Sequence, residues 1–125
     1  METPLKDFTS LRVWQHSRHF AVKIYKITSA FPRDEIFGLT SQLRRASVSI
    51  ASNIAEGFGR FSFKEKVQFY NIAQSSLIET QNQLIISKDV DYLPEKEFHM
   101  VYNESVLIAK MLSALVRSSR SKFGS

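Results

Sequence analysis

The stretch PEKEFHMVYNESVLIAKMLSALVR, residues 94–117, decides the fold class of this chain. Pro94 suits the first position of a helix, because proline lacks the N–H group that goes unpaired there. Apolar or small residues then recur at intervals of three and four, which places them on one face of an α-helix: Phe98, Val101, Ser105, Ile108, Leu112 and Leu115. The stretch therefore predicts a long helix that buries one face against a core.

The residues upstream carry the start and stop signals of further helices. Ser10 can serve as an N-cap, and Phe31-Pro32 ends the helix that follows, because a residue before proline avoids the helical region. Thr40 can cap a second helix, which Gly57 or Gly59 would end.

A third helix begins with Ser62-Phe63-Lys64-Glu65, which fits the capping box, in which the serine and glutamate side chains each bind a free backbone N–H. Short connections between helices of this length predict an all-α protein with an antiparallel, up-down-up-down four-helix bundle. The expected helices span about 10–30, 40–57, 62–88 and 94–117, and a basic, frayed tail covers 118–125.

The composition agrees with a single helical domain. The 125 residues are 43% hydrophobic and 23% charged, and glycine (4) and proline (3) are too scarce for a typical all-β domain. The absence of cysteine excludes disulfides, thiolate zinc sites and cysteine nucleophiles. No apolar run is long enough for a membrane span or a signal peptide, so we expect a cytoplasmic protein without membrane contact.

The first helix carries two apolar stripes instead of one. Leu11, Trp14, Ala21 and Tyr25 form the first stripe. The second is rotated by roughly 100° and contains Val13, Phe20, Ile24, Ile27 and Phe31. A bundle helix needs one stripe for its own core, so the surplus predicts a contact with another copy of the chain. The alternative is a helix packed deeply between its two neighbours.

A polar stripe follows the second helix within an arc of about 80°. It consists of Gln42, Arg45, Ser49, Asn53 and Glu56. This stripe is either a solvated edge or a hydrogen-bonded network between helices or subunits. In the second case Glu79 of the third helix is the expected partner of Arg45, because a buried arginine needs a carboxylate.

Basic residues suggest contact with a polyanion, because the chain has a formal net charge of +5. One arc of the first helix carries cations and no acid, and such a face can lie along a phosphate backbone. The candidate nucleic-acid-binding residues are Arg12, His16, His19, Lys23, Lys26, Arg44, Arg60, Lys64, Arg117 and Arg120. The alternative is that these side chains only keep the protein soluble.

The sequence contains no arrangement typical of an enzyme. No nucleophile, base and orienting group stand in a recognisable pattern. His16 and His19 have metal-ligand spacing, but no carboxylate follows on that face, so we expect neither a metal nor a cofactor. The phenylalanines near the predicted helix ends are expected to close the core or to form an end patch for a partner: Phe8, Phe58, Phe61 and Phe63.

Several motifs resemble the 23S ribosomal RNA intervening-sequence protein family of bacteria, also described as four helix bundle proteins. The resemblance covers about residues 8–115. It rests on Phe8-x-x-Leu11-x-Val13-Trp14-Gln15, Tyr25, Phe31-Pro32-x-x-Glu35-x-x-Gly38-Leu39-x-x-Gln42-x-x-Arg45, Ser49-Ile50-x-x-Asn53-Ile54-Ala55-Glu56-Gly57-x-Gly59-Arg60 and Ser76-x-x-Glu79.

The resemblance implies a four-helix bundle that assembles as a homopentamer and has no established enzymatic activity. The accessory variability proteins of diversity-generating retroelements look like distant relatives, and they are basic pentamers that bind nucleic acid and a reverse transcriptase. We therefore expect a non-enzymatic homopentamer that binds RNA or DNA as an accessory factor, with the polar stripe at or near the subunit interface. The alternative function is a ring that serves as a scaffold for a protein partner.

Overall fold

The computed structural model describes residues 7–124, which form four α-helices and two short 3-10 turns. No strand occurs among these residues, so the predicted all-α class with four helices is confirmed. The elements are η1 (Phe8–Ser10), α1 (Arg12–Thr28), η2 (Arg33–Glu35), α2 (Leu39–Phe58), α3 (Phe63–Asp89) and α4 (Glu95–Phe123).

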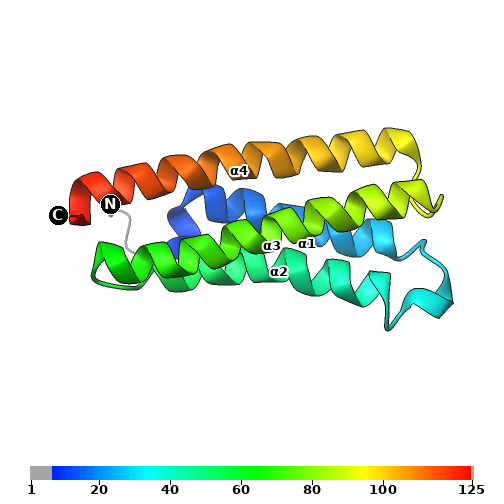
Figure 1. Ribbon diagram of the computed structural model, residues 1–125, viewed down its shortest axis with the longest axis horizontal. Helices are drawn as coiled ribbons and strands as arrows, with labels where there is room; N and C mark the ends of the chain where they lie inside the picture. Colours follow the sequence, from blue (N-terminus) through cyan, green and yellow to red (C-terminus); the bar gives the residue numbers. More distant parts are fainter. Residues whose placement is uncertain (1–6, 125) are drawn as a thin grey trace, which may run out of the picture.

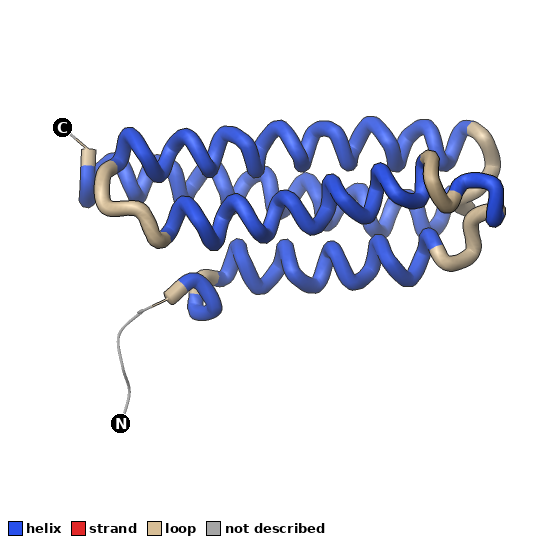
Figure 2. The backbone as a smooth tube through the Cα atoms, turned by 90° about the horizontal axis from the view of Figure 1, so that it is seen from below, coloured by secondary structure: helices blue, strands red, loops and turns tan. Residues whose placement is uncertain are grey.

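The four helices lie side by side along one long axis, and the chain reverses its direction at each connection (Figure 1). Each helix contacts its two neighbours, α1 with α2 and α4, and α3 with α2 and α4, and no contact joins α1 to α3 across the centre. The view turned by 90° shows all connections at the two ends of the bundle (Figure 2). Residues within one helix therefore reach solvent on one side and the core on the other.

Side chains from all four helices fill the centre of the bundle. The stripe predicted on the last helix is buried from Phe98 to Leu112, and Leu115 packs against the edge of the core. The largest side chains with almost no exposed surface are Phe20, Ile24, Leu43, Ile50, Ile54, Tyr70, Leu77, Leu84, Ile108 and Leu112. None of the helices within residues 7–124 combines the length and the apolar character that a membrane span requires.

Two of the predicted N-caps are wrong, and one is confirmed. Ser10 lies in η1, and the residue before α1 is Leu11, which has no side-chain cap. Thr40 lies inside α2 and does not cap it. Instead, Glu35 Oε1 accepts a hydrogen bond from the Leu39 backbone N–H at 2.9 Å. Ser62 caps α3 as predicted, because its Oγ accepts from the Glu65 N–H at 3.2 Å.

Helix α4 does not end where the sequence predicts. The segment 118–125 is expected to be a frayed tail, yet the helix continues to Phe123. The cause is tertiary contact with α3: Ser119 is buried, and the Lys66 ammonium lies 4.8 Å from the centre of the Phe123 ring. The guanidinium of Arg120 also lies 5.1 Å from the centre of the Phe63 ring. Only Ser125 of the predicted tail falls outside the described residues.

Candidate nucleic-acid interface and neighbouring surfaces

Charge is separated along the axis of the bundle. The end formed by the α2–α3 connection and the C-terminus of α4 (the basic end; Figure 1) holds six cations and three acids. Its cations are Arg60, Lys64, Lys66, Arg117, Arg120 and Lys122, and its acids are Asp7, Glu56 and Glu65. At the opposite end (the acidic end) the two kinds of charge nearly balance, with Asp34, Glu35, Asp89, Asp91, Glu95 and Glu97 against Lys26, Arg33, Arg44, Lys88 and Lys96.

Phenylalanine rings lie among the cations of the basic end. The Arg60 guanidinium is 4.6 Å from the centre of the Phe69 ring and 3.8 Å from a Glu56 carboxylate oxygen. Phe61, in the connection itself, is 92% exposed. A hollow of about 430 Å³ lies beside it. Its lining includes one acid, Asp7, which forms no ion pair within residues 7–124, together with Phe8, Phe58, Arg60, Phe61, Lys66 and Phe123. The phenylalanines expected near the helix ends therefore form a patch together with basic side chains.

Lys66 is the buried cation of the basic end, since only 4% of it is exposed. Its Nζ donates a hydrogen bond to the Phe58 backbone carbonyl at 2.9 Å, at the C-terminus of α2 where unpaired carbonyls gather. Among residues 7–124 it forms no ion pair. Burial lowers the pKa of Lys66, because the charged ammonium loses water that nothing anionic replaces.

The first-helix arc is less basic than its sequence predicts. Lys23 on α1 forms an ion pair with Glu104 on α4, with 2.6 Å between Nζ and Oε2. The acid comes from a helix 81 residues further along the chain, so inspection of the first helix alone cannot reveal it. His16 is half-buried, while Arg12, His19 and Lys26 are exposed. Among residues 7–124, no three histidine, aspartate or glutamate side chains come together as a set of metal ligands.

Arg44 is directed toward α1, and its guanidinium is therefore less available to a ligand. Its Nε donates to the Thr28 hydroxyl at 2.9 Å, and its guanidinium lies 4.7 Å from the centre of the Tyr25 ring. It thereby binds the C-terminus of α1, where the helix dipole favours a cation. Of the ten candidate residues, Arg12, Arg60, Lys64, Arg117 and Arg120 are thus the exposed ones at or near the basic end.

Three residues of the predicted polar stripe, Gln42, Arg45 and Ser49, line a cleft of about 220 Å³ between α2 and α3. Its central bonds join Ser49 Oγ to Ser76 Oγ at 2.8 Å and Asn53 Nδ2 to Ser49 Oγ at 3.0 Å. Arg45 and Glu79 border the same cleft, but both are exposed and no ion pair joins them within residues 7–124. Glu56 lies at the basic end, where it is near Arg60.

Gln83 hydrogen-bonds to two residues that line this cleft, and the sequence pattern does not identify it. The side chain is 5% exposed, and its amide N–H group donates to Glu79 at 3.2 Å and to Gln42 at 3.5 Å. Its buried Oε1 has no donor within the described residues. An orphaned buried acceptor is costly for the stability of the folded chain.

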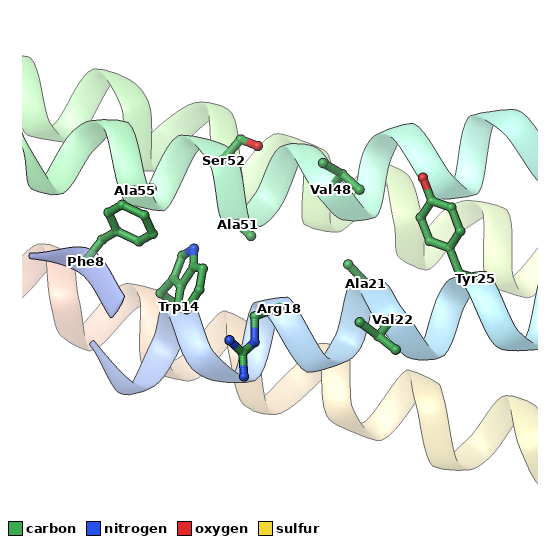
Figure 3. A pocket seen from close by; sticks show the side chains of 10 residues that line it. All are labelled: Phe8, Trp14, Arg18, Ala21, Val22, Tyr25, Val48, Ala51, Ser52 and Ala55. Atoms are coloured by element: carbon green, nitrogen blue, oxygen red, sulfur yellow. The ribbon is translucent and has the colours of Figure 1, made fainter. Parts of the chain in front are cut away.

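A groove between α1 and α2 (the apolar groove) shows what becomes of the first stripe of α1. It has a volume of about 600 Å³, and Arg18 is the one charged residue that lines it. Phe8 and Trp14 lie at one end and Tyr25 at the other, opposite the small side chains of α2 (Figure 3). The full lining is Phe8, Trp14, Arg18, Ala21, Val22, Tyr25, Val48, Ala51, Ser52 and Ala55.

A convex apolar surface lies on α3. Ile72, Ile78, Ile85 and Ile86 (the isoleucine ridge) are 38% to 58% exposed. At 100° per residue they fall within an arc of about 140°. The charged residues exposed on α3 between Ile72 and Val90 are Glu79 and Asp89, both acidic. The ridge borders the polar cleft through Glu79.

Comparison with known proteins connects this architecture to a family. The model of the 23S rRNA-intervening sequence protein family matches residues 9–114. Among solved structures, the chain is similar to a protein of unknown function from the S23 ribosomal protein family of Bacteroides thetaiotaomicron. The two share 27% identity with a TM-score of 0.75, over 83% of this chain and 97% of the other. No curated protein matches the chain. The resemblance seen in the sequence is confirmed, and the chain belongs to the 23S rRNA-intervening sequence protein family.

Proposed function

We propose that this protein is a non-enzymatic accessory factor that binds RNA or DNA as a homopentamer of antiparallel four-helix bundles. The separation of charge along the bundle is the observation that carries the binding proposal. Six cations stand against three acids at the basic end, whereas five cations and six acids nearly balance at the other, so the excess of positive charge is local. A local excess of positive charge attracts phosphates and releases their counterions.

The basic end is a better candidate for phosphate contact than the arc of the first helix. Lys64 and Arg117 are exposed and form no ion pair within residues 7–124, whereas Lys23 is paired with Glu104. Replacing Lys23 by glutamate would bring two carboxylates together across α1 and α4, so that variant would test stability as much as binding.

A pair of variants with the same change in net charge tests the proposal. Lys64→Glu with Arg117→Glu removes charge at the basic end, and Lys96→Glu with Lys110→Glu removes it elsewhere. Fluorescence anisotropy with structured RNA, single-stranded DNA and duplex DNA at near-physiological salt should show lost binding only for the first pair. Equal loss in both pairs would mean that the charge acts generically. Unchanged binding in both would contradict the proposed site.

Assembly is supported by two unpartnered apolar surfaces of opposite shape. The apolar groove is concave and has Arg18 in its lining, while the isoleucine ridge is convex and has Glu79 beside it. The ridge from Ile72 to Ile86 is about 21 Å long, and the groove along α1 from Trp14 to Tyr25 about 17 Å. Surfaces on different sides of one chain produce a head-to-tail contact, which closes into a ring at a suitable angle.

The mass of the wild-type protein tests the assembly. Light scattering should give about five times the 14.4 kDa of one chain if the ring closes with five subunits. A monomer at all concentrations would reject both the ring and the role of the two surfaces.

The alternative function is a scaffold for a protein partner. The apolar groove favours this function only if the groove stays open in the assembly. The scaffold function predicts that wild-type protein assembles but binds no nucleic acid at near-physiological salt.

A further inference from the structure

Phe61 is a large apolar side chain in almost complete contact with water. It lies in the connection of residues 59–62 between α2 and α3, and 92% of it is exposed. Arg60 precedes it in the chain, and Arg60 and Lys66 line the same hollow as the Phe61 ring. Exposed aromatic rings combined with cations are the usual stacking surfaces for unpaired bases.

The hollow beside Phe61 provides room for a flat ligand. Its volume is about 430 Å³, and four aromatic rings line it: Phe8, Phe58, Phe61 and Phe123. A single exposed phenylalanine would need no explanation. Phe61 does need one, because it lies at the rim of an aromatic hollow, where a base that stacks on its ring can also contact the other rings that line the hollow.

Lys66 adds an independent observation at the same hollow. Its ammonium is buried against Phe58 and Phe123, at 5.4 Å and 4.8 Å from the two ring centres, and donates to one carbonyl. An ammonium carries three N–H donors, and within residues 7–124 this one has no carboxylate partner. A buried cation without an anion is unfavourable, so a phosphate at the hollow would supply what the chain lacks.

We propose that this hollow binds an unpaired nucleotide of RNA or DNA, with the base stacked on Phe61 and the phosphate held by Arg60 and Lys66. The inference rests on the proposed nucleic-acid function and names its ligand class. Both faces of a base inside a duplex are covered by neighbouring bases, so only an unpaired or extruded base can stack on the ring. Duplexes would then bind through charge alone.

The test uses the full chain and the variant Phe61→Ala. Phe37→Ala is a matched control, because Phe37 is 94% exposed in a connection at the acidic end. Anisotropy titrations would use an unstructured uridine RNA of roughly 12 nucleotides, within usual site sizes, the corresponding thymidine DNA, and a duplex of the same length. Phe61→Ala should weaken single-strand binding about tenfold or more and leave duplex binding unchanged, while Phe37→Ala should change neither.

The outcomes separate this inference from the function on which it rests. Wild-type protein that binds no probe at near-physiological salt would contradict the proposed function. Wild-type binding that Phe61→Ala leaves intact, or weakens equally for single strands and duplex, would overturn the stacking site alone. Phe61→Trp adds a second readout: single strands should bind normally and quench its fluorescence, while the duplex should not. The RNA and DNA probes show which source of unpaired bases the site prefers.

Discussion

Gly57 shows how one residue connects the sequence motif to packing. A Cβ atom at this position would lie 2.6 Å from Cε1 of Tyr70, a buried ring with 1% of its surface exposed. Gly57 therefore allows α2 and α3 to approach each other closely. It does not end α2, because it lies within that helix. Gly59, the residue after the helix, has φ −79°, a value open to any residue.

Gly57→Ala should destabilise the protein, because the added methyl group would force the buried Tyr70 ring out of its packed position. Overpacking of a core costs about 1–3 kcal/mol, so the free energy of unfolding in urea should fall by that amount. Gly59→Ala is the matched control, since its Cβ would lie 3.7 Å from the nearest atom, the Glu56 carbonyl oxygen. Equal stability of the two variants would refute the packing explanation.

Glu35 joins three parts of the chain at the acidic end. One carboxylate oxygen accepts from the Leu39 N–H at 2.9 Å, and the other accepts from the Tyr92 hydroxyl at 3.0 Å. The hydrogen bond to Glu35 raises the pKa of Tyr92, because ionised tyrosine would lose its acceptor and face a like charge. The side chain thus connects η2, the start of α2 and the α3–α4 connection.

Glu35→Ala should reduce stability by about 1–2 kcal/mol, since it removes a helix cap and a hydrogen bond. Tyr92→Phe removes only the second bond and should have a smaller effect. Asp34→Ala, at an exposed neighbouring carboxylate, provides the control for charge. Thermal unfolding monitored by circular dichroism would measure all three, and a Glu35→Ala variant as stable as Asp34→Ala would contradict the role of Glu35.

At the scale of the helix, apolar periodicity predicts the two faces of α1 but does not predict the end of α4. The two stripes of α1 were readable from the sequence, and the structure gives them different neighbours. Val13, Phe20 and Ile24 enter the core, whereas Trp14 and Tyr25 line the groove. The end of α4 was not readable, because its polar segment is helical through contacts with α3.

Removing residues 118–125 should therefore destabilise the bundle, although the sequence describes a frayed tail. The loss of buried Ser119 and half-exposed Phe123 should cost about 1–2 kcal/mol. Hydrogen exchange provides a second measurement, since the amides of Ser119 to Phe123 should be protected in the full chain. Fast exchange of these amides, together with unchanged stability after truncation, would support the frayed tail that the sequence predicts.

At the scale of the whole molecule, a head-to-tail assembly places the isoleucine ridge of one chain in the apolar groove of the next. Val22→Glu damages the groove, and Ile78→Glu damages the ridge; these residues are 49% and 58% exposed, so each chain should still fold. Each variant alone should be monomeric. A mixture should form a one-to-one dimer, because the first variant keeps its ridge and the second keeps its groove.

The control for this experiment is Leu107→Glu on α4, which is 44% exposed and lies outside both surfaces. Its mass should equal that of the wild type in light scattering. A mixture that stays monomeric would reject head-to-tail pairing. Variants that retain the wild-type mass would show that other surfaces hold the assembly together.

Arg45 belongs to the same scale, because it is exposed in the single chain. We expect Arg45→Ala to leave monomer stability unchanged and to weaken the assembly, since the polar cleft borders the ridge that a neighbour would cover. Removal of one partner from a buried charged network costs about 3–5 kcal/mol. The melting temperature should become more dependent on concentration than that of the wild type. A variant with unchanged melting temperature and mass would contradict the network.

The sequence alone determined the four helices, most of the core and the family, because apolar periodicity, the Ser62 cap and the motifs are local properties of the chain. Only the tertiary structure decided which cations are free. Lys23 is neutralised by Glu104, Arg44 binds the end of α1, and Lys66 is buried against phenylalanine rings. Charge and burial depend on neighbours from distant segments, and local spacing carries no information about them. For the same reason the groove, the ridge and the aromatic hollow beside Phe61 became visible only when the helices were packed together.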